Sequence, residues 1–253
     1  AGQGVTAVMQ PFVRSRHELE QVRAALARRG LEHLTIFAKI EDRRGRQSLP
    51  QWMDACDVVT VAPSFEMYWV NCNILGLNHV PVAYNDDLSF SMENLIAAIG
   101  PNTDIVVLLN PNNPVGDAFS REDVIAAIEA ARAVDAVVII DEAYHYFYPN
   151  TFIDLTQTYD NVIVMRTFSK LFSLAACRLG VIISNPTIIH YVENAKLTFD
   201  VNALALLFGE KILDHPEIAE ELIAAEREGR TWTIETLQER GYEARPSEGN
   251  FIF

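Results

Sequence analysis

The sequence lacks the features that would place a protein in a membrane, outside the cell or at a cysteine metal site. Only three of its 253 residues are cysteines (Cys56, Cys72 and Cys177), and none stands in a Cys-x-x-Cys pair. This scarcity excludes a disulfide framework and favours a reducing cytoplasm. No apolar run reaches the roughly 18 to 20 residues of a membrane-spanning helix, and no signal-peptide pattern opens the chain. We therefore expect a cytoplasmic protein with no membrane partner.

Basic residues are also scarce. The chain has 20 Lys and Arg against 34 Asp and Glu, a formal charge of −14, which argues against nucleic-acid partners. Nine of the basic residues lie in residues 1–48, where a boundary or a basic surface helix would explain them. The six histidines show no His-x-x-x-His spacing, so we expect no metal site. The 49% hydrophobic content is that of an ordinary globular protein.

Short apolar runs rich in branched side chains alternate with helical patterns. We expect strands at residues 7–13, 33–40, 57–62, 104–109, 137–140, 162–166 and 179–184. We expect helices at residues 15–30, 49–56, 120–134 and 216–240, with two short strand-like pieces at the end, the last at 250–253. This alternation predicts an α/β fold: a mostly parallel sheet flanked by helices.

Polar side chains follow three of these expected strands. They are Asn113, Asp141, Tyr144, Thr167, Ser169, Lys170 and, eight residues further on, Arg178. Open α/β sheets bind ligands at the carboxyl ends of their strands, so we expect these side chains to share one site.

The types of side chain in this set are those that pyridoxal phosphate requires. Its aldehyde reacts with a lysine amine, and its ring nitrogen needs a carboxylate partner. An amide and a phenol suit its 3′-oxygen, and hydroxyls with an arginine suit its phosphate. Each residue alone has an ordinary explanation, such as a helix cap or a surface lysine. Only the joint pattern indicates the cofactor.

From about Asp57 to Phe253 the sequence resembles the fold-type I pyridoxal-phosphate aminotransferases, and among them the histidinol-phosphate aminotransferase group. The motifs that carry the resemblance are residues 63–68 (PSFEMY), 110–116 (NPNNPVG), 141–144 (DEAY), 166–170 (RTFSK) and 178–180 (RLG). The resemblance implies an aminotransferase large domain with an incomplete small C-terminal domain. It also implies a homodimer that acts on amine and 2-oxo acid substrates in amino-acid biosynthesis.

The resemblance also assigns roles to single residues. Lys170 forms the Schiff base and moves the substrate proton, and Asp141 pairs with the ring nitrogen. Together with Tyr144 they are the implied catalytic residues. The implied cofactor-binding set is Tyr68, Asn113, Asp141, Tyr144, Thr167, Ser169, Lys170 and Arg178. Within it, Tyr68 packs near the cofactor ring, and Thr167, Ser169 and Arg178 hold the phosphate.

Both ends of the chain depart from this family. The first 56 residues lack its phosphate-binding turn, and instead residues 9–15 and 36–41 resemble two βα pieces of the pyruvate kinase barrel, with Lys39 and Glu41 at that family's active-site positions. Near the other end, Arg240 and Arg245 do not match the family's substrate-binding arginine. We therefore predict a hybrid or truncated chain with three parts: an atypical βα segment (1–56), a cofactor-binding large domain (57–212) and the start of a small domain (213–253).

Other functions remain open from the sequence. The same cofactor motifs would serve a decarboxylase or a lyase. A cofactor-binding or purely structural protein without turnover is a further alternative, because both ends depart from the family. A phosphotransferase like pyruvate kinase has the least support.

Overall fold

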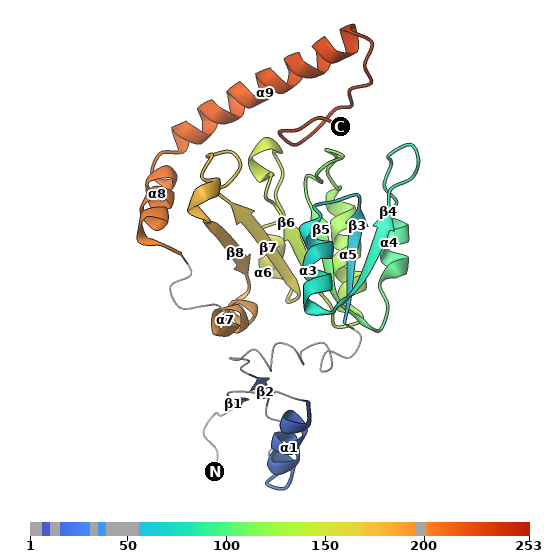
Figure 1. Ribbon diagram of the computed structural model, residues 1–253, viewed down its shortest axis with the longest axis vertical. Coiled ribbons are helices and arrows are strands. Elements are labelled where there is room, and N and C mark those ends of the chain that lie inside the picture. Colours follow the sequence, from blue (N-terminus) through green and yellow to red (C-terminus); the bar gives the residue numbers. More distant parts are fainter. Residues whose placement is uncertain (1–6, 11–15, 31–34, 39–55, 196–200) are drawn as a thin grey trace. The chain divides into compact units, whose positions relative to one another are not determined.

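The computed structural model describes residues 7–10, 16–30, 35–38, 56–195 and 201–253 (Figure 1). The chain divides into two compact units. One contains Ala1–Cys56 with Trp69–Asn78, and the other contains Asp57–Tyr68 with His79–Phe253. Each unit is described by itself below.

The first unit contains a small βαβ arrangement. Strands β1 (Ala7–Gln10) and β2 (Thr35–Ala38) pair in parallel, and helix α1 (Arg16–Ala27) lies between them in the chain. This confirms the described parts of the two strands and the helix expected there. The outer parts of both predicted strands lie outside the described residues, as do Lys39, Glu41 and most of the helix expected at 49–56. Helix α3 (Met67–Leu75) belongs largely to this unit.

The second unit is built on a six-stranded sheet of order β4-β3-β5-β6-β7-β8. The strands are β3 (Asp57–Ala62), β4 (Asn78–Ala83), β5 (Thr103–Leu109), β6 (Val137–Asp141), β7 (Val162–Thr167) and β8 (Gly180–Ser184). Strands β3, β5, β6 and β7 pair in parallel, and β8 runs antiparallel to β7. The mostly parallel sheet predicted from the sequence is confirmed.

Helices connect and follow these strands (Figure 1). They are α4 (Met92–Ala98), α5 (Arg121–Arg132), α6 (Leu155–Thr158), α7 (Pro186–Ala195), α8 (Ala203–Leu213) and α9 (Pro216–Glu239), with short 3₁₀ turns η2 (His145–Phe147) and η3 (Ala175–Cys177). Side-chain caps fix where two of them begin. The Ser120 hydroxyl accepts from the Asp123 amide at 3.1 Å, and Asn202 accepts from the Ala205 amide at 2.9 Å.

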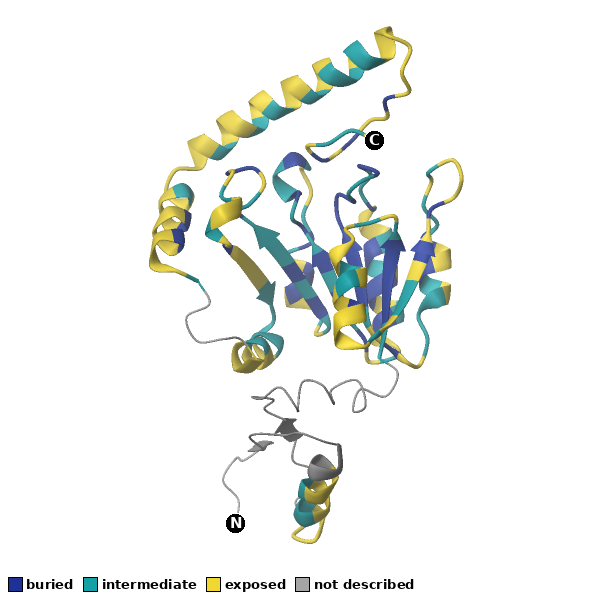
Figure 2. Ribbon diagram, viewed as in Figure 1, coloured by how far each residue is buried: buried dark blue, intermediate teal, exposed yellow. Residues whose placement is uncertain are grey.

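The core of this unit lies between the central strands and α5. Val106, Leu108, Val138 and Ile140 of β5 and β6 are completely buried, and Ile128 of α5 is buried with them. Figure 2 shows this burial concentrated in the central strands. Their branched side chains suit a sheet covered on both faces. Within the described residues, no helix combines the length and the apolar character needed to cross a membrane.

The C-terminal residues correct one prediction. No strand forms in described residues 241–253, although strand-like pieces were expected there. The Glu248 amide instead donates to the Gly116 carbonyl at 2.6 Å, and the Phe251 ring packs edge-on against Tyr144 with 4.9 Å between centroids. A short apolar piece becomes a strand only where a sheet edge is available to pair with it. This segment lies against the loops that follow β5 and β6.

Candidate functional site

The carboxyl ends of β5, β6 and β7 lie beside one another. Leu109 of β5 pairs with Asp141 of β6, and Asp141 pairs with Met165 of β7. The three following loops therefore start at the same edge of the sheet, where parallel α/β sheets bind ligands. These loops carry the side chains that the sequence predicts to share a site.

Asp141 is a buried carboxylate with only partial compensation of its charge. Its Oδ2 accepts a 2.6 Å hydrogen bond from the Tyr68 hydroxyl, and its Oδ1 accepts from the Ala143 amide at 2.9 Å. Burial raises the pKa of Asp141, while these hydrogen bonds and the charge of Lys170 act to lower it. Burial and the nearby Asp141 charge also raise the pKa of Tyr68. This carboxylate is therefore suited to a cationic partner.

Asn113, Tyr144 and Lys170 come together beside this carboxylate. The Asn113 side-chain amide donates to the Tyr144 hydroxyl at 2.7 Å. The Lys170 amine lies 5.3 Å from the centroid of the Tyr144 ring, within the range of a cation–π contact. Tyr144 is buried and Lys170 is exposed, so the amine is accessible to a ligand.

The predicted phosphate-binding residues are only partly brought together. The Thr167 and Ser169 hydroxyls are 2.9 Å apart, and the Ser169 amide donates to the Thr167 hydroxyl at 3.1 Å. Arg178 is exposed, and its guanidinium donates to the Ala175 carbonyl at 3.3 Å. Within residues 56–195, no hydrogen bond joins Arg178 to either hydroxyl. Thr167 and Ser169 thus form a hydroxyl pair at the end of β7, with Arg178 on the loop that follows.

Two residues of the quoted motifs have a structural position that sequence reasoning did not assign. Glu142 is buried and forms an ion pair with Arg166, with 2.8 Å between Oε2 and Nη2. Both residues adjoin predicted site residues, namely Asp141 and Thr167. Their places in the motifs were the only sequence signal available, because the partners are 24 residues apart.

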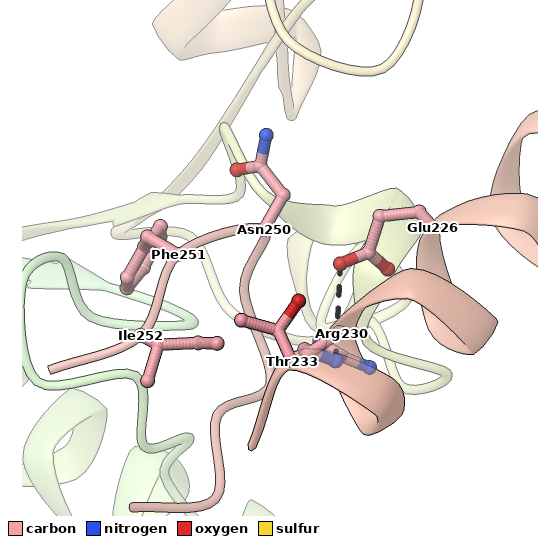
Figure 3. A pocket seen from close by; sticks show the side chains of 6 residues that line it. All are labelled: Glu226, Arg230, Thr233, Asn250, Phe251 and Ile252. Atoms are coloured by element: carbon pink, nitrogen blue, oxygen red, sulfur yellow. Dashed lines mark ion pairs between the residues drawn. The ribbon is translucent and has the colours of Figure 1, made fainter. Parts of the chain in front are cut away.

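A cavity of about 410 Å³ adjoins the site. Figure 3 shows Glu226, Arg230 and Thr233 of α9 on one side of it and Phe251 and Ile252 on the other. The Phe251 ring forms the link, since it also packs against Tyr144. Arg230 donates to the Gly249 carbonyl at 2.6 Å, and its Nε lies 3.8 Å from a Glu226 carboxylate oxygen. Burial raises the pKa of Glu226, so this wall is polar but partly desolvated.

Taken together, the edge of the sheet offers a buried carboxylate, an accessible amine, an amide–phenol pair and two neighbouring hydroxyls. An acidic group and an amine at one site can hold a protonated aromatic ring and attack a carbonyl carbon. In the described ranges, no three His, Cys, Asp or Glu side chains gather as a metal site.

Comparisons with known proteins give the chain its relatives. Residues 45–253 match the profile of the family described as aminotransferase class I and II. The histidinol-phosphate aminotransferase of Thermoanaerobacter pseudethanolicus is 34% identical over 191 residues, which are 75% of this chain and 54% of that protein. That of Thermotoga maritima is 35% identical over 191 residues, 76% of this chain and 54% of the relative. The chain thus spans about half the length of these curated relatives.

Solved structures agree with the sequence matches. The crystal structure of histidinol-phosphate aminotransferase from Sinorhizobium meliloti in complex with pyridoxal-5′-phosphate has a TM-score of 0.71 and 27% identity, with 78% of this chain and 55% of that chain covered. A putative aminotransferase from Burkholderia pseudomallei has a TM-score of 0.67 and 28% identity, with 79% and 60% covered.

Proposed function

Because the chain belongs to the class I and II aminotransferase family, we propose that it is a pyridoxal-phosphate-dependent aminotransferase. It would transfer an amino group between an amino compound and a 2-oxo acid. One observation carries the proposal: the buried Asp141 carboxylate and the accessible Lys170 amine lie at the same edge of the sheet, on either side of Tyr144 in the motif order. Neither an isolated helix cap nor an isolated surface lysine would produce this arrangement.

The residues present fit the cofactor. Asp141, whose charge is only partly compensated, would pair with the protonated ring nitrogen. The Lys170 amine would hold the cofactor covalently and carry the proton at the substrate α-carbon. Asn113 and Tyr144 would bind the 3′-oxygen, while Thr167, Ser169 and Arg178 would hold the phosphate. When bound, the cofactor supplies an electron sink for the carbanion formed at that carbon.

The substrates follow from the relatives. Curated proteins similar to this chain are named histidinol-phosphate aminotransferases, so we propose an amino donor of that kind, or an amino acid, with a 2-oxo acid as acceptor. The polar cavity behind Phe251 adjoins the place where such a donor would lie. On the same grounds we place the protein in amino-acid biosynthesis.

We propose that the protein is a cytoplasmic homodimer. All three cysteines are free, as a reducing compartment requires. Helix α8 exposes five large apolar side chains, Leu204, Leu206, Leu207, Phe208 and Leu213. A surface of this kind is usually covered in the assembled protein, and the family resemblance supports a second copy as the cover. Sedimentation velocity of the full chain and of Leu207→Glu tests this, with a shift to monomer expected for the variant.

The domain plan of the sequence remains our proposal. Residues 1–56 would be a βα segment of other origin, 57–212 the cofactor-binding large domain and 213–253 the start of the small domain. The division of the chain into compact units, with a boundary between Cys56 and Asp57, supports the first of these boundaries.

Borohydride trapping tests the function. The purified chain is mixed with pyridoxal phosphate, reduced and digested, and the labelled peptide is identified. The chain has four lysines, Lys39, Lys170, Lys196 and Lys211, so the label can be assigned without ambiguity. We expect label on Lys170, its loss in Lys170→Ala and its retention in Lys211→Ala, because Lys211 is an exposed residue of α8 paired with Asp214. Label on another lysine would refute the assignment.

A half-reaction separates transfer from the alternative chemistries. The loaded protein is mixed with histidinol phosphate or an amino acid in the absence of a 2-oxo acid. An aminotransferase converts its cofactor to the amine form and releases the oxo product in equal amount. Release of carbon dioxide would indicate a decarboxylase, and no change would indicate binding without turnover.

A further inference from the structure

A buried ion pair connects the two strand ends that carry Asp141 and Lys170. Glu142 follows Asp141 directly, and Arg166 lies four residues before Lys170 in the chain. Nε and Nη2 of Arg166 lie 2.9 and 2.8 Å from Oε2 of Glu142. The Glu142 side chain is only 1% exposed, so water does not compete for this contact.

The loop before α6 completes the coordination of Glu142. Its Oε1 accepts from the Phe152 amide at 2.7 Å and from the Thr151 hydroxyl at 2.9 Å. Arg166 Nη2 also donates to the Thr151 hydroxyl at 2.7 Å. Both carboxylate oxygens are therefore satisfied, and three separate segments are tied together by charged or short hydrogen bonds.

The pair lies behind the site. Side chains alternate between the faces of a strand, so Glu142 and Arg166 point to the face opposite Asp141 and Thr167. The printed contacts agree, since Asp141 bonds to Tyr68 whereas Glu142 bonds to the loop at Thr151. The Glu142 amide also donates to the Met165 carbonyl at 2.8 Å, which links the two strands at this level.

We propose that Glu142 and Arg166 are positioning residues that set the Asp141 carboxylate relative to the loop carrying Lys170. This inference rests on the proposed function. A buried ion pair is a poor source of stability, because desolvation of the two charges offsets most of their attraction. Its directional hydrogen bonds do hold two strand ends in one relative position, and a ligand site needs supporting residues that hold it to within about 0.5 Å.

Four variants of the full chain test the proposal. Glu142→Gln and Arg166→Met each break the pair and leave one partner buried without its counterpart. The double variant Glu142→Gln/Arg166→Met removes both charges, so no lone charge remains buried and its melting temperature should exceed that of either single variant. Leu95→Ala is the matched control, because Leu95 is fully buried in the core cluster that contains none of the predicted site residues.

The measurements are the dissociation constant of pyridoxal phosphate, the visible circular dichroism of the bound cofactor and the melting temperature without it. We expect both single variants and the double variant to bind the cofactor about ten-fold more weakly, the usual size for a supporting partner of a site residue. Their dichroism should change in shape or amplitude at saturating cofactor. Leu95→Ala should lower the melting temperature and leave both cofactor readouts unchanged.

Two results would overturn the proposal. One is wild-type affinity and dichroism in the double variant, which is expected to fold even if the single variants do not. The other is an equal loss in Leu95→Ala, which would make the effect one of general stability. Failure of the proposed function gives a different result: the unaltered chain would then show no borohydride label on Lys170.

Discussion

The Tyr68 hydroxyl donates a 2.6 Å hydrogen bond to Oδ2 of Asp141, across 73 residues of sequence. The phenol gives the carboxylate a hydrogen bond but no positive charge, so the electrostatic demand of the buried carboxylate is only partly met. A group that brings a cation to this position would meet it. The site therefore combines a stable resting contact with a remaining preference for a cationic ligand.

Replacing Asp141 by Asn should stabilise the chain in a pH-dependent way when no cofactor is added. Burial raises the pKa of Asp141 above its ordinary value in the folded protein. The folded chain then holds this proton at pH values where the unfolded chain has lost it, so the stability of the wild type falls as pH rises through that window. Urea unfolding between pH 4 and pH 7 should show that the advantage of Asp141→Asn grows with pH.

The exposed Asp104 of β5 supplies the control, because Asp104→Asn should show no comparable trend. A buried Asp117, whose pKa burial also raises, is present in every protein compared and so cancels in the difference. An advantage of Asp141→Asn that stays constant across the range would contradict the prediction.

Tyr68→Phe should lower the free energy of unfolding at pH 7 by about 1.5–3 kcal/mol, the range for a hydrogen bond to a charged group. Phenylalanine keeps the ring that packs edge-on against Phe65, so the change isolates the hydroxyl. Chemical denaturation gives the value, with Tyr242→Phe at an exposed position as the comparison. Equal unfolding free energies for Tyr68→Phe and the wild type would show that the phenol does not stabilise Asp141.

Tyr144→Phe should weaken the binding of pyridoxal phosphate about ten-fold, which corresponds to about 1.4 kcal/mol. The variant leaves the Asn113 amide without its 2.7 Å acceptor and removes one proposed donor to the 3′-oxygen. The ring under the Lys170 amine remains, so borohydride label on Lys170 should persist. Fluorescence titration measures the affinity, and unchanged binding would remove Tyr144 from the cofactor site.

Gly116→Ala should detach the C-terminal segment from the loop after β5. Gly116 has a φ of +90°, which L side chains rarely adopt, and an added Cβ would lie 2.8 Å from the Ser247 Cβ. We expect a loss of about 1–3 kcal/mol and faster proteolysis near the C-terminal end. The companion change Ser247→Gly relieves the steric conflict but not the backbone strain, so the double variant should recover only part of the loss. Full recovery would show that strain contributes nothing.

Some features escaped prediction because their sequence signal is weak. Strand β4 (Asn78–Ala83) contains Pro81, which lacks a hydrogen-bond donor and obscures the strand pattern. The piece at 250–253 shows the opposite case: its apolar residues read as a strand, but they pack on Tyr144 and no sheet edge pairs with them. Strand formation depends on a partner elsewhere in the fold, which a local pattern does not reveal.

The sequence by itself determined the central strands and the polar residues at their ends. Unbroken branched runs such as that of β6 leave little alternative to a buried parallel strand, and Ser120 and Asn202 mark where helices begin because their side chains cap the first turn. Only the tertiary structure decided which of these residues meet. Tyr68 reaches Asp141, Glu142 reaches Arg166 and Arg178 turns to Ala175 because strand register and loop geometry bring distant segments together or keep them apart.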